Sequence, residues 1–288
     1  MQLSQFLSTA LGCLVLVVMM GIGLTVTTGD LRQVWRKPKA MIVGLLAQTI
    51  FLPLVALGMC LLFDLPSDIQ IGLVILAASP GGPSSNVYSL LAGGDVALNV
   101  SLTAVNNVIG VFILPLYVMA AVHLFERTDP LMVSMFSKMA DVITSVILPI
   151  AVGMALTRFW PRFSVSLGKY LKIMSVLALM AIIAAVGYAN WGILSVSATQ
   201  YGWVILLFNV VALALGYAVP KWFGLERKQA IAIAFEIGIH NGSLALYVAI
   251  TLLGKQAYAI APGLYSVLMY FTAAAFFFWI RKGHRVRI

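Results

Sequence analysis

The sequence predicts an all-α membrane protein with nine transmembrane helices, and three features of the chain lead to this fold class. The first is composition, because 62% of the 288 residues are hydrophobic, 9% are charged, and the mean hydropathy is +1.03. A soluble domain carries about 25% charged residues, so this chain must place much of its surface in lipid. The second is the recurrence of apolar runs long enough to cross a bilayer as α-helices. The third is the placement of basic residues between those runs.

The apolar runs divide the chain into nine segments within one transmembrane domain that occupies residues 1–288. We expect no separate soluble domain, because little of the chain lies outside the segments. The first run has no basic region before it and no small-residue cleavage site after it, so we interpret it as a retained helix and not as a signal peptide. The predicted segments are about 7–27, 39–63, 70–92, 96–123, 132–158, 168–189, 200–222, 226–252 and 258–281.

The distribution of Lys and Arg residues predicts the orientation, because cytoplasmic loops of membrane proteins are enriched in them. If the first loop is cytoplasmic, that side holds 15 of the 18 Lys and Arg residues, whereas the opposite orientation violates the rule. We therefore expect a multi-pass protein of the cell (inner) membrane with its N-terminus outside and its C-terminus in the cytoplasm. The 15 residues are Arg32, Arg36, Lys37, Lys39, Arg158, Arg162, Lys169, Lys172, Lys221, Arg227, Lys228, Arg281, Lys282, Arg285 and Arg287; Arg127, Lys138 and Lys255 lie on or near the outer side.

Two of the segments contain residues that interrupt a helix. Residues 79–86 read Ser-Pro-Gly-Gly-Pro-Ser-Ser-Asn, and two prolines with two glycines in so short a stretch break an α-helix. Residues 236–243 place glycines, polar side chains and the carboxylate of Glu236 inside the eighth segment. Glu236 is about ten residues, or roughly 15 Å of helix, from the start of that segment, which is near the centre of the bilayer. Backbone groups freed by such breaks must be covered by protein or by a water-filled cavity.

The two interrupted segments occupy matching positions, which predicts inverted repeats. Each follows two apolar segments and precedes one, so the first repeat covers about 7–123, and a linking segment with the second repeat covers about 132–281. The single linking segment gives the repeats opposite orientations. Inverted repeats whose broken helices cross the membrane centre are typical of secondary transporters, in which the ion and substrate sites lie at the breaks.

An ionised carboxylate near the bilayer centre needs a partner. No Lys or Arg lies at the depth of Glu236 in the predicted segments, which leaves Na⁺ or a proton. A structural acid, protonated or hydrogen-bonded, is the alternative interpretation, and a packing kink is the alternative for residues 79–86. His240 is either a hydrogen-bonded structural residue or a proton carrier, and Asn106 and Asn107 are equally suited to helix–helix contacts. Hard cations take oxygen ligands, and the side-chain oxygens near the breaks are those of Gln48, Ser84, Ser85, Asn86, Asn99, Thr103 and Asn241.

The same features disfavour other classes of protein. The net charge of +9 is explained by the loops, so we expect no nucleic-acid partner. Cys13 and Cys60 lie in apolar segments and no metal-binding motif is present, so we expect no cofactor and no metal except sodium. An intramembrane enzyme would need a nucleophile with a base, and a channel does not require inverted broken helices. We therefore expect a protein that is not an enzyme. We also expect it to be a monomer or a weak oligomer.

The residues around both breaks resemble the bile acid:sodium symporter family. The resemblance is carried by residues 79–86, 94–103 and 234–242, and it extends from the first segment to the last. It implies panel and core domains that move relative to one another, two crossing broken helices that bind two Na⁺ ions, and amphipathic organic anions as substrates, including bile acids and small organic acids such as pantoate. It implies a first sodium site at Ser85, Asn86, Asn99, Thr103 and Glu236, a second at Gln48, Glu236, the carbonyls of Ile237 and Ile239, and His240, and a substrate cleft at Pro80, Gly81, Gly82, Asn241 and Gly242.

The chain also departs from the family pattern. Nine segments are predicted where many members have ten. His240 stands where the family has Gln, and a neutral imidazole offers only one acceptor nitrogen, so the second sodium site is altered, lost or replaced by a proton site. Asn99 stands where Ser is common and still offers an oxygen. Ser79 stands where Cys is frequent, which argues against the related arsenite exporters.

The sequence therefore predicts sodium-coupled symport of an organic anion by alternating access. The alternative is a proton-coupled or sodium-independent organic anion transporter that uses Glu236 and His240. Replacement of Na⁺ by choline at fixed pH distinguishes the two hypotheses.

Overall fold

The computed structural model describes residues 2–26, 33–126, 131–189 and 191–285, and these ranges are almost entirely helical. Arg32, Arg127 and Arg287, which enter the predicted orientation, lie outside them. The helices are α1 (Gln2–Thr25), α3 (Gln33–Arg36), α4 (Pro38–Leu46), α5 (Leu52–Leu62), α6 (Ser67–Ala78), α7 (Ser84–Leu91), α8 (Val96–Glu126), α9 (Leu131–Phe159), α10 (Pro161–Ala189), α11 (Trp191–Trp222), α12 (Arg227–Gly238), α13 (Gly242–Tyr247) and α14 (Ile260–Arg285). Two π-helical turns, Ala47–Phe51 and Val248–Leu252, and a 3₁₀ turn, Gln256–Ala259, connect some of these helices.

The described part of the chain fits an all-α membrane protein. Six of its helices are long and apolar enough to cross a membrane: Ser8–Thr25, Pro38–Leu62, Val96–Glu126, Pro161–Ala185, Leu194–Trp222 and Gln256–Lys282. The shorter apolar helices Ser67–Ala78, Ile143–Phe159 and Gly242–Leu252 overlap the third, fifth and eighth predicted segments. The total of nine membrane crossings stays a prediction.

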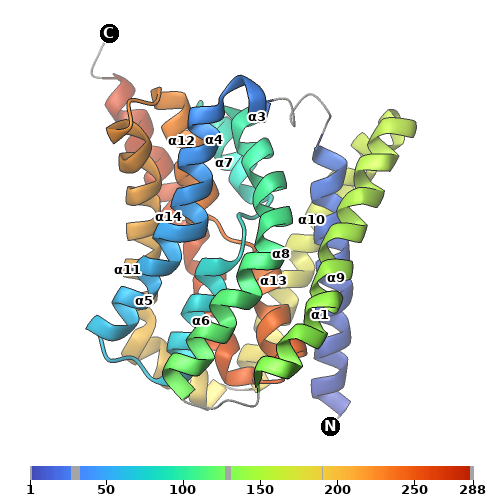
Figure 1. Ribbon diagram of the computed structural model, residues 1–288, viewed down its shortest axis with the longest axis vertical. Coiled ribbons are helices and arrows are strands. Elements are labelled where there is room, and N and C mark those ends of the chain that lie inside the picture. The colour runs from blue at the N-terminus through green and yellow to red at the C-terminus, as the bar shows by residue number, and fades with distance from the viewer. Residues whose placement is uncertain (1, 27–32, 127–130, 190, 286–288) are drawn as a thin grey trace.

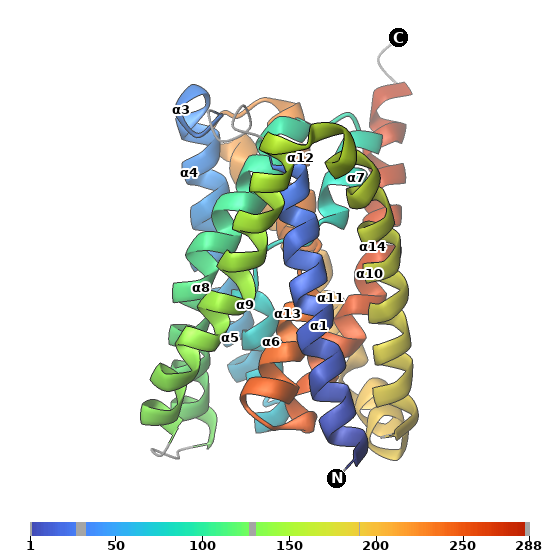
Figure 2. The same cartoon turned by 90° about the vertical axis from the view of Figure 1, so that its right-hand side faces the viewer.

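The helices run along the long axis of the molecule, with α1 beginning at one end and α14 finishing at the other (Figure 1). The start of α4, the start of α12 and the finish of α14 share one end (Figure 1). We call this the basic end, because these segments carry many of the chain's cationic residues. The residues that define it are Arg36, Lys37, Lys39, Arg227, Lys228, Arg281 and Lys282. The junction between α9 and α10 lies at the same end (Figure 2).

Polar contacts hold the helices together at the basic end. Lys37 forms a salt bridge with Asp95. The backbone N–H of Asp95 donates to the carbonyl of Lys228 at 2.9 Å, and its carboxylate accepts from the N–H of Leu98 at 3.1 Å, which caps the start of α8. Glu226 begins a capping box at the start of α12. These contacts tie α4, α8 and α12 to one another.

The helices form two packed units. The three-helix unit consists of α1, α9 and α10, in which α1 packs against both of the others. The crossing unit consists of α4 to α8 and α11 to α14 and contains both broken segments. Glycines let α1 approach α9, because a Cβ on Gly23 would lie 2.2 Å from the carbonyl oxygen of Ile150, and one on Gly153 would lie 2.4 Å from that of Met20. Small residues at such contacts are typical of helix pairs in membranes.

We expect Gly23→Ala to lower the thermal unfolding midpoint of the detergent-purified protein by several degrees. The added methyl group cannot fit against the carbonyl of Ile150 unless α1 moves away from α9. Gly21→Ala is the control, because no atom lies within 4 Å of a carbon added there. The control should unfold at the same temperature or slightly higher, since alanine favours a helix over glycine by about 1 kcal/mol. Equal destabilisation by both changes would contradict the role of this contact.

Candidate functional site

The two broken segments meet through their backbones. The first helix stops at Ala78 and resumes as α7 at Ser84, and the second stops at Gly238 and resumes as α13 at Gly242. Between these ends, Gly81 pairs with His240 as an isolated antiparallel bridge. The N–H of Gly82 donates to the carbonyl of Ile239 at 2.7 Å, and the N–H of Asn241 donates to that of Pro80 at 2.9 Å. Each break therefore supplies hydrogen-bond partners for backbone groups that the other leaves open.

Glycine is required at the crossing for close approach. A Cβ on Gly81 would lie 2.3 Å from Oε1 of Glu236, and a Cβ on Gly82 would lie 2.8 Å from the carbonyl oxygen of His240. Real Cβ atoms do not approach other atoms so closely. The Gly-Gly pair of the first break thus lets its backbone lie directly against the Glu236 carboxylate and the second break.

Glu236 lies on α12 with 1% of its surface exposed, and three side chains donate to its carboxylate. The hydroxyls of Thr103 and Ser85 lie 2.6 Å and 2.9 Å from Oε2, and Nδ2 of Asn106 lies 3.3 Å from Oε1. Ser85 is on α7, and Thr103 and Asn106 are on α8. All three donors therefore come from the first broken segment and the helix that follows it, and the acid comes from the second broken segment.

Asn99 links the same cluster to the backbone of α12. Its Nδ2 donates to the carbonyl of Ala232 at 2.6 Å, while its Oδ1 lies 3.0 Å from the hydroxyl of Ser85. Its own carbonyl lies 3.0 Å from the hydroxyl of Thr103. Each of these hydroxyls has one hydrogen and lies within reach of two acceptors, Glu236 and Asn99. The hydrogen can turn from one acceptor to the other without any movement of the oxygen.

A second polar group converges on the carbonyl of Ser79. Nε2 of Gln48 and Nδ1 of His240 each lie 3.0 Å from this oxygen. A carbonyl oxygen only accepts, so Nδ1 of His240 carries a hydrogen, and Nε2 is the acceptor nitrogen of the neutral ring. Gln48 lies in the π-helical turn Ala47–Phe51, and such turns are frequent at functional sites. The ring of His240 also packs edge-on against Tyr265 with ring centres 5.3 Å apart.

Several buried polar atoms near the crossing have no hydrogen-bond partner within the described part of the chain. Most of these atoms are oxygens or nitrogens with a lone pair, and the amide Nδ2 of Asn241 is a donor. Buried polar groups are normally paired, so a group of this kind calls for an explanation. A cation that takes oxygen ligands fits this surplus of acceptors. The acceptor atoms are Gln48 Oε1, Asn86 Oδ1, Asn106 Oδ1, Asn107 Oδ1 and His240 Nε2; Ser89 Oγ is also unpartnered but lies beside Gly94, at the turn between α7 and α8.

The structure brings together some of the residues predicted for the site. Ser85, Asn99, Thr103 and Glu236 share one hydrogen-bonded cluster. Asn86 is next to it in sequence but makes no described contact with Glu236. For the predicted second site, Gln48 and His240 share the carbonyl of Ser79, Ile237 is buried on α12, and the carbonyl of Ile239 accepts from Gly82. The predicted cleft residues Pro80, Gly81, Gly82, Asn241 and Gly242 are all buried at the crossing.

Three polar residues that support the second break were not anticipated from the sequence. Nδ2 of Asn209 and the hydroxyl of Tyr265 donate to the carbonyl of Gly238 at 2.9 Å and 3.0 Å, and the hydroxyl of Thr272 donates to Asn209. This carbonyl is at the last residue of α12 and has lost its helical partner. Asn209 could have been found from the sequence, because its amide stands in the middle of an apolar segment. No such pattern in the sequence marks Tyr265 or Thr272.

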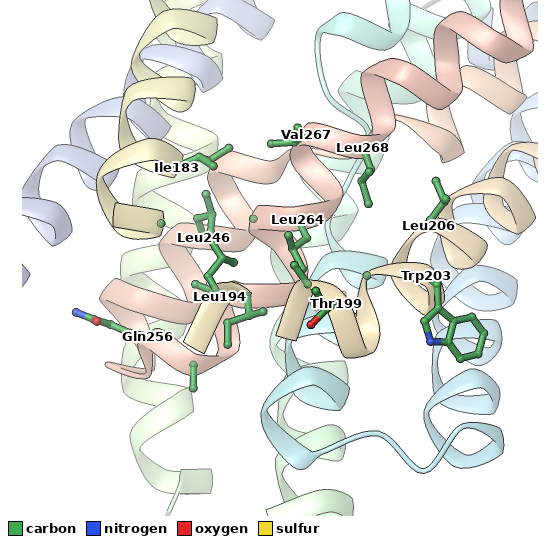
Figure 3. Close-up of a pocket in the computed structure, with 17 residues that line it drawn as sticks. Ile183, Leu194, Thr199, Trp203, Leu206, Leu246, Gln256, Leu264, Val267 and Leu268 are labelled. Atoms are coloured by element: carbon green, nitrogen blue, oxygen red, sulfur yellow. The ribbon is translucent and has the colours of Figure 1, made fainter. Parts of the chain in front are cut away.

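An apolar cavity of about 650 Å³ lies where the three-helix unit meets the crossing unit (Figure 3). Ile183 comes from α10, Leu194 and Trp203 from α11, and Leu264 from α14. Leu246 of α13 places the second broken segment at its wall. The polar side chains in this lining are those of Thr199 and Gln256. The cavity is therefore suited to the apolar part of an amphipathic molecule.

These features define a class of protein: an all-α membrane protein whose two broken helices cross beside a buried carboxylate, as in secondary transporters. A model of the sodium bile acid symporter family matches residues 13–197, which is more than half of the chain, and the chain belongs to this family. Its relatives are transporters and not enzymes. The matched range includes residues 79–86 and 94–103, which carry two parts of the resemblance, whereas residues 234–242 lie beyond it.

Three relatives illustrate the match. The chain is 31% identical over 242 residues to the uncharacterized sodium-dependent transporter YocS of Bacillus subtilis, covering 84% of this chain and 73% of the relative. It is 28% identical to the probable sodium/metabolite cotransporter BASS1 of Arabidopsis thaliana chloroplasts, over 87% and 61% of the two chains. It is 27% identical to the human ileal sodium/bile acid cotransporter, over 84% and 69%. The chain therefore spans between about 61% and 73% of the length of these relatives.

We expect Gly81→Ala to lower the unfolding midpoint by displacing the Glu236 carboxylate, which would lie 2.3 Å from the new methyl group. The same change in a Glu236→Ala background should cost much less, because the clashing group is absent. This non-additivity in thermal unfolding measures the contact directly. An equal cost of Gly81→Ala in the two backgrounds would show that the glycine is needed for some other reason.

Proposed function

We propose that this protein is a secondary active transporter that couples the entry of Na⁺ to symport of an organic anion by alternating access. The observation that carries the proposal is the position of Glu236, a buried carboxylate whose side-chain hydrogen-bond partners are the neutral residues Ser85, Thr103 and Asn106. A cation at this point would neutralise a charge that is expensive within a membrane. The names of the relatives, which include sodium-dependent and sodium/metabolite transporters, support Na⁺ as that cation.

The first proposed sodium site consists of Ser85, Asn86, Asn99, Thr103 and Glu236. The hydroxyls of Ser85 and Thr103 donate to Glu236, but each also has an acceptor on Asn99 at 3.0 Å. When Na⁺ enters, the two hydrogens can turn to Asn99, and both hydroxyl oxygens then present lone pairs to the ion. The site can thus change from a hydrogen-bonded acid to a set of oxygen ligands with little movement of heavy atoms.

The second proposed site consists of Gln48, Glu236, the carbonyls of Ile237 and Ile239, and His240. Oε1 of Gln48 and Nε2 of His240 are both unpartnered acceptors. Na⁺ prefers oxygen, whereas an imidazole nitrogen readily takes a proton. The geometry of His240 therefore favours a specific alternative, in which the second coupling ion is H⁺, or in which transport is independent of sodium and uses Glu236 with His240.

The proposed substrate is a bile-acid-like anion or a small organic acid such as pantoate. Nδ2 of Asn241 is a buried donor without a described partner, and it suits an anionic oxygen. We propose that the substrate cleft includes Pro80, Gly81, Gly82, Asn241 and Gly242. The apolar cavity between α10, α11 and α14 would accept the hydrophobic part of an amphipathic substrate.

We further propose nine membrane crossings, with the three-helix unit as the panel and the crossing unit as the core. Motion of one unit against the other would expose the crossing to each side in turn, while the paired backbones of the breaks move together. The N-terminus lies outside and the C-terminus inside, in the cell (inner) membrane. The transporter works as a monomer or a weak oligomer, without a cofactor.

We expect Glu236→Ala to abolish Na⁺-stimulated uptake in proteoliposomes while the protein still folds. Glu236→Gln keeps the size of the side chain and should also lose the stimulation, because the negative charge that binds the cation is gone. Asp64→Asn, an acid-to-amide change at an exposed turn with positive φ that Asn tolerates, is the control and should transport normally. Sodium-driven uptake by either Glu236 variant at the wild-type rate would disprove the assignment.

We expect replacement of Na⁺ by choline at constant pH to stop uptake by the wild-type protein. In His240→Gln an amide oxygen replaces the imidazole acceptor, so the Na⁺ concentration for half-maximal uptake should fall and any dependence on external pH should weaken. Uptake rates against Na⁺ and against pH measure both effects. Wild-type uptake that persists in choline and follows a pH gradient would instead establish the proton-coupled alternative.

A further inference from the structure

A second cavity, of about 670 Å³, lies at the basic end and has a different character from the apolar one. It is formed by the last turn of α7, the first turns of α12 and the end of α14. Four of its lining residues are cationic: Arg227 and Lys228 from α12, and Arg281 and Lys282 from α14. Within the described part of the chain its lining contains no acidic residue. The cavity therefore concentrates positive charge that the proposed transport site does not use.

The walls of this cavity are apolar, so the cations border a hydrophobic surface. Leu91 and Phe278 contribute side chains that are 60% and 62% exposed, and Ile231 and Ile280 contribute buried ones. The guanidinium of Arg227 donates to the carbonyl of Ile280 at 2.8 Å, which joins the start of α12 to the end of α14. A ligand that fills this space must have an anionic group and an apolar part.

The depth of the cavity corresponds to the surface of the bilayer. Trp222, near the start of α12, is 88% exposed, and Trp279, one turn before the end of the cavity on α14, is 59% exposed. Exposed tryptophans collect at the level of lipid headgroups. Cations at the same level meet the phosphates of the adjacent leaflet, and basic pockets between helices on the cytoplasmic side bind anionic headgroups.

We propose that this cavity binds the phosphate headgroup of an anionic phospholipid from the leaflet at the basic end. Arg227, Lys228, Arg281 and Lys282 surround the phosphate, and the exposed faces of Leu91 and Phe278 contact the first part of the acyl chains. A soluble anion would use the cations but would leave these apolar faces uncovered. The proposal requires only that the chain spans a membrane, and it is independent of sodium coupling.

The test is the thermal unfolding of the full-length protein in an uncharged detergent, titrated with phosphatidylglycerol, phosphatidylcholine or inorganic phosphate. Phosphatidylglycerol should raise the unfolding midpoint, whereas the other two should not. The variant Arg281→Gln/Lys282→Gln should unfold at the wild-type temperature without lipid and bind phosphatidylglycerol roughly thirtyfold more weakly, given the contribution expected of each cation near a membrane surface. Lys228→Gln, on the opposite wall, is an independent single change with a smaller effect in the same direction.

Arg158→Gln/Arg162→Gln is the matched control, because it removes two exposed cations at the α9–α10 junction, at the same end but outside the cavity. It should keep the wild-type response to phosphatidylglycerol. An equal loss in this control would mean that the lipid responds to surface charge in general and would overturn the proposal. Stabilisation by inorganic phosphate to the same extent would also overturn it, in favour of a site for a free anion. If phosphatidylglycerol had no effect on the unfolding midpoint of the wild-type protein, the proposal would likewise be overturned.

Discussion

Within the described part of the chain, Glu236 on α12 receives its side-chain hydrogen bonds from α7 and α8, and the architecture of the crossing depends on this interaction. A carboxylate in the middle of a membrane protein is stable only if donors or a cation face it. The donors Ser85, Thr103 and Asn106 reach it because α7 and α8 lie against α12, and α7 can lie there because Gly81 has no side chain. The absence of a Cβ in the first break and the presence of an acid beside the second are thus two parts of one contact.

Backbone and side-chain polar groups at the crossing differ in how fully they are hydrogen-bonded. Its backbone groups pair closely, since Gly82, Ile239, Pro80 and Asn241 satisfy one another, and Asn209 with Tyr265 supports the end of α12. Several of its side-chain acceptors, by contrast, have no described partner. A rigid backbone with unsatisfied side chains is the arrangement expected of a site that binds and releases a ligand without refolding. In the proposed alternating-access mechanism, the large motion would then occur at the boundary between the three-helix unit and the crossing unit.

Features that depend on local composition could be predicted from the sequence. Two prolines and two glycines at 80–83 break a helix, and a lone acid in an apolar segment must be buried in protein, so both breaks and the burial of Glu236 could be predicted. Contacts between distant segments were not. The association of Asn209, Tyr265 and Thr272 depends on how α11 and α14 pack, and none of the three has a neighbour in sequence that indicates it. The donor role of Asn106 likewise depends on the rotation of α8 about its axis.

The direction in which Gln48 points illustrates how finely such rotation is set. Gln48 lies in a π-helical turn, which holds one residue more than the α-helical turn it replaces. One residue of an α-helix corresponds to a rotation of about 100°, so the extra residue shifts the angular register between α4 and α5 by that amount. If this extra residue were absent and α5 kept its packing, α4 would be rotated, and a side chain other than that of Gln48 would face the carbonyl of Ser79. The partnership between Gln48 and His240 across that carbonyl is therefore a matter of chain length as much as of residue type: a single deletion between 47 and 51 could remove it while every polar residue of the site remained in the sequence.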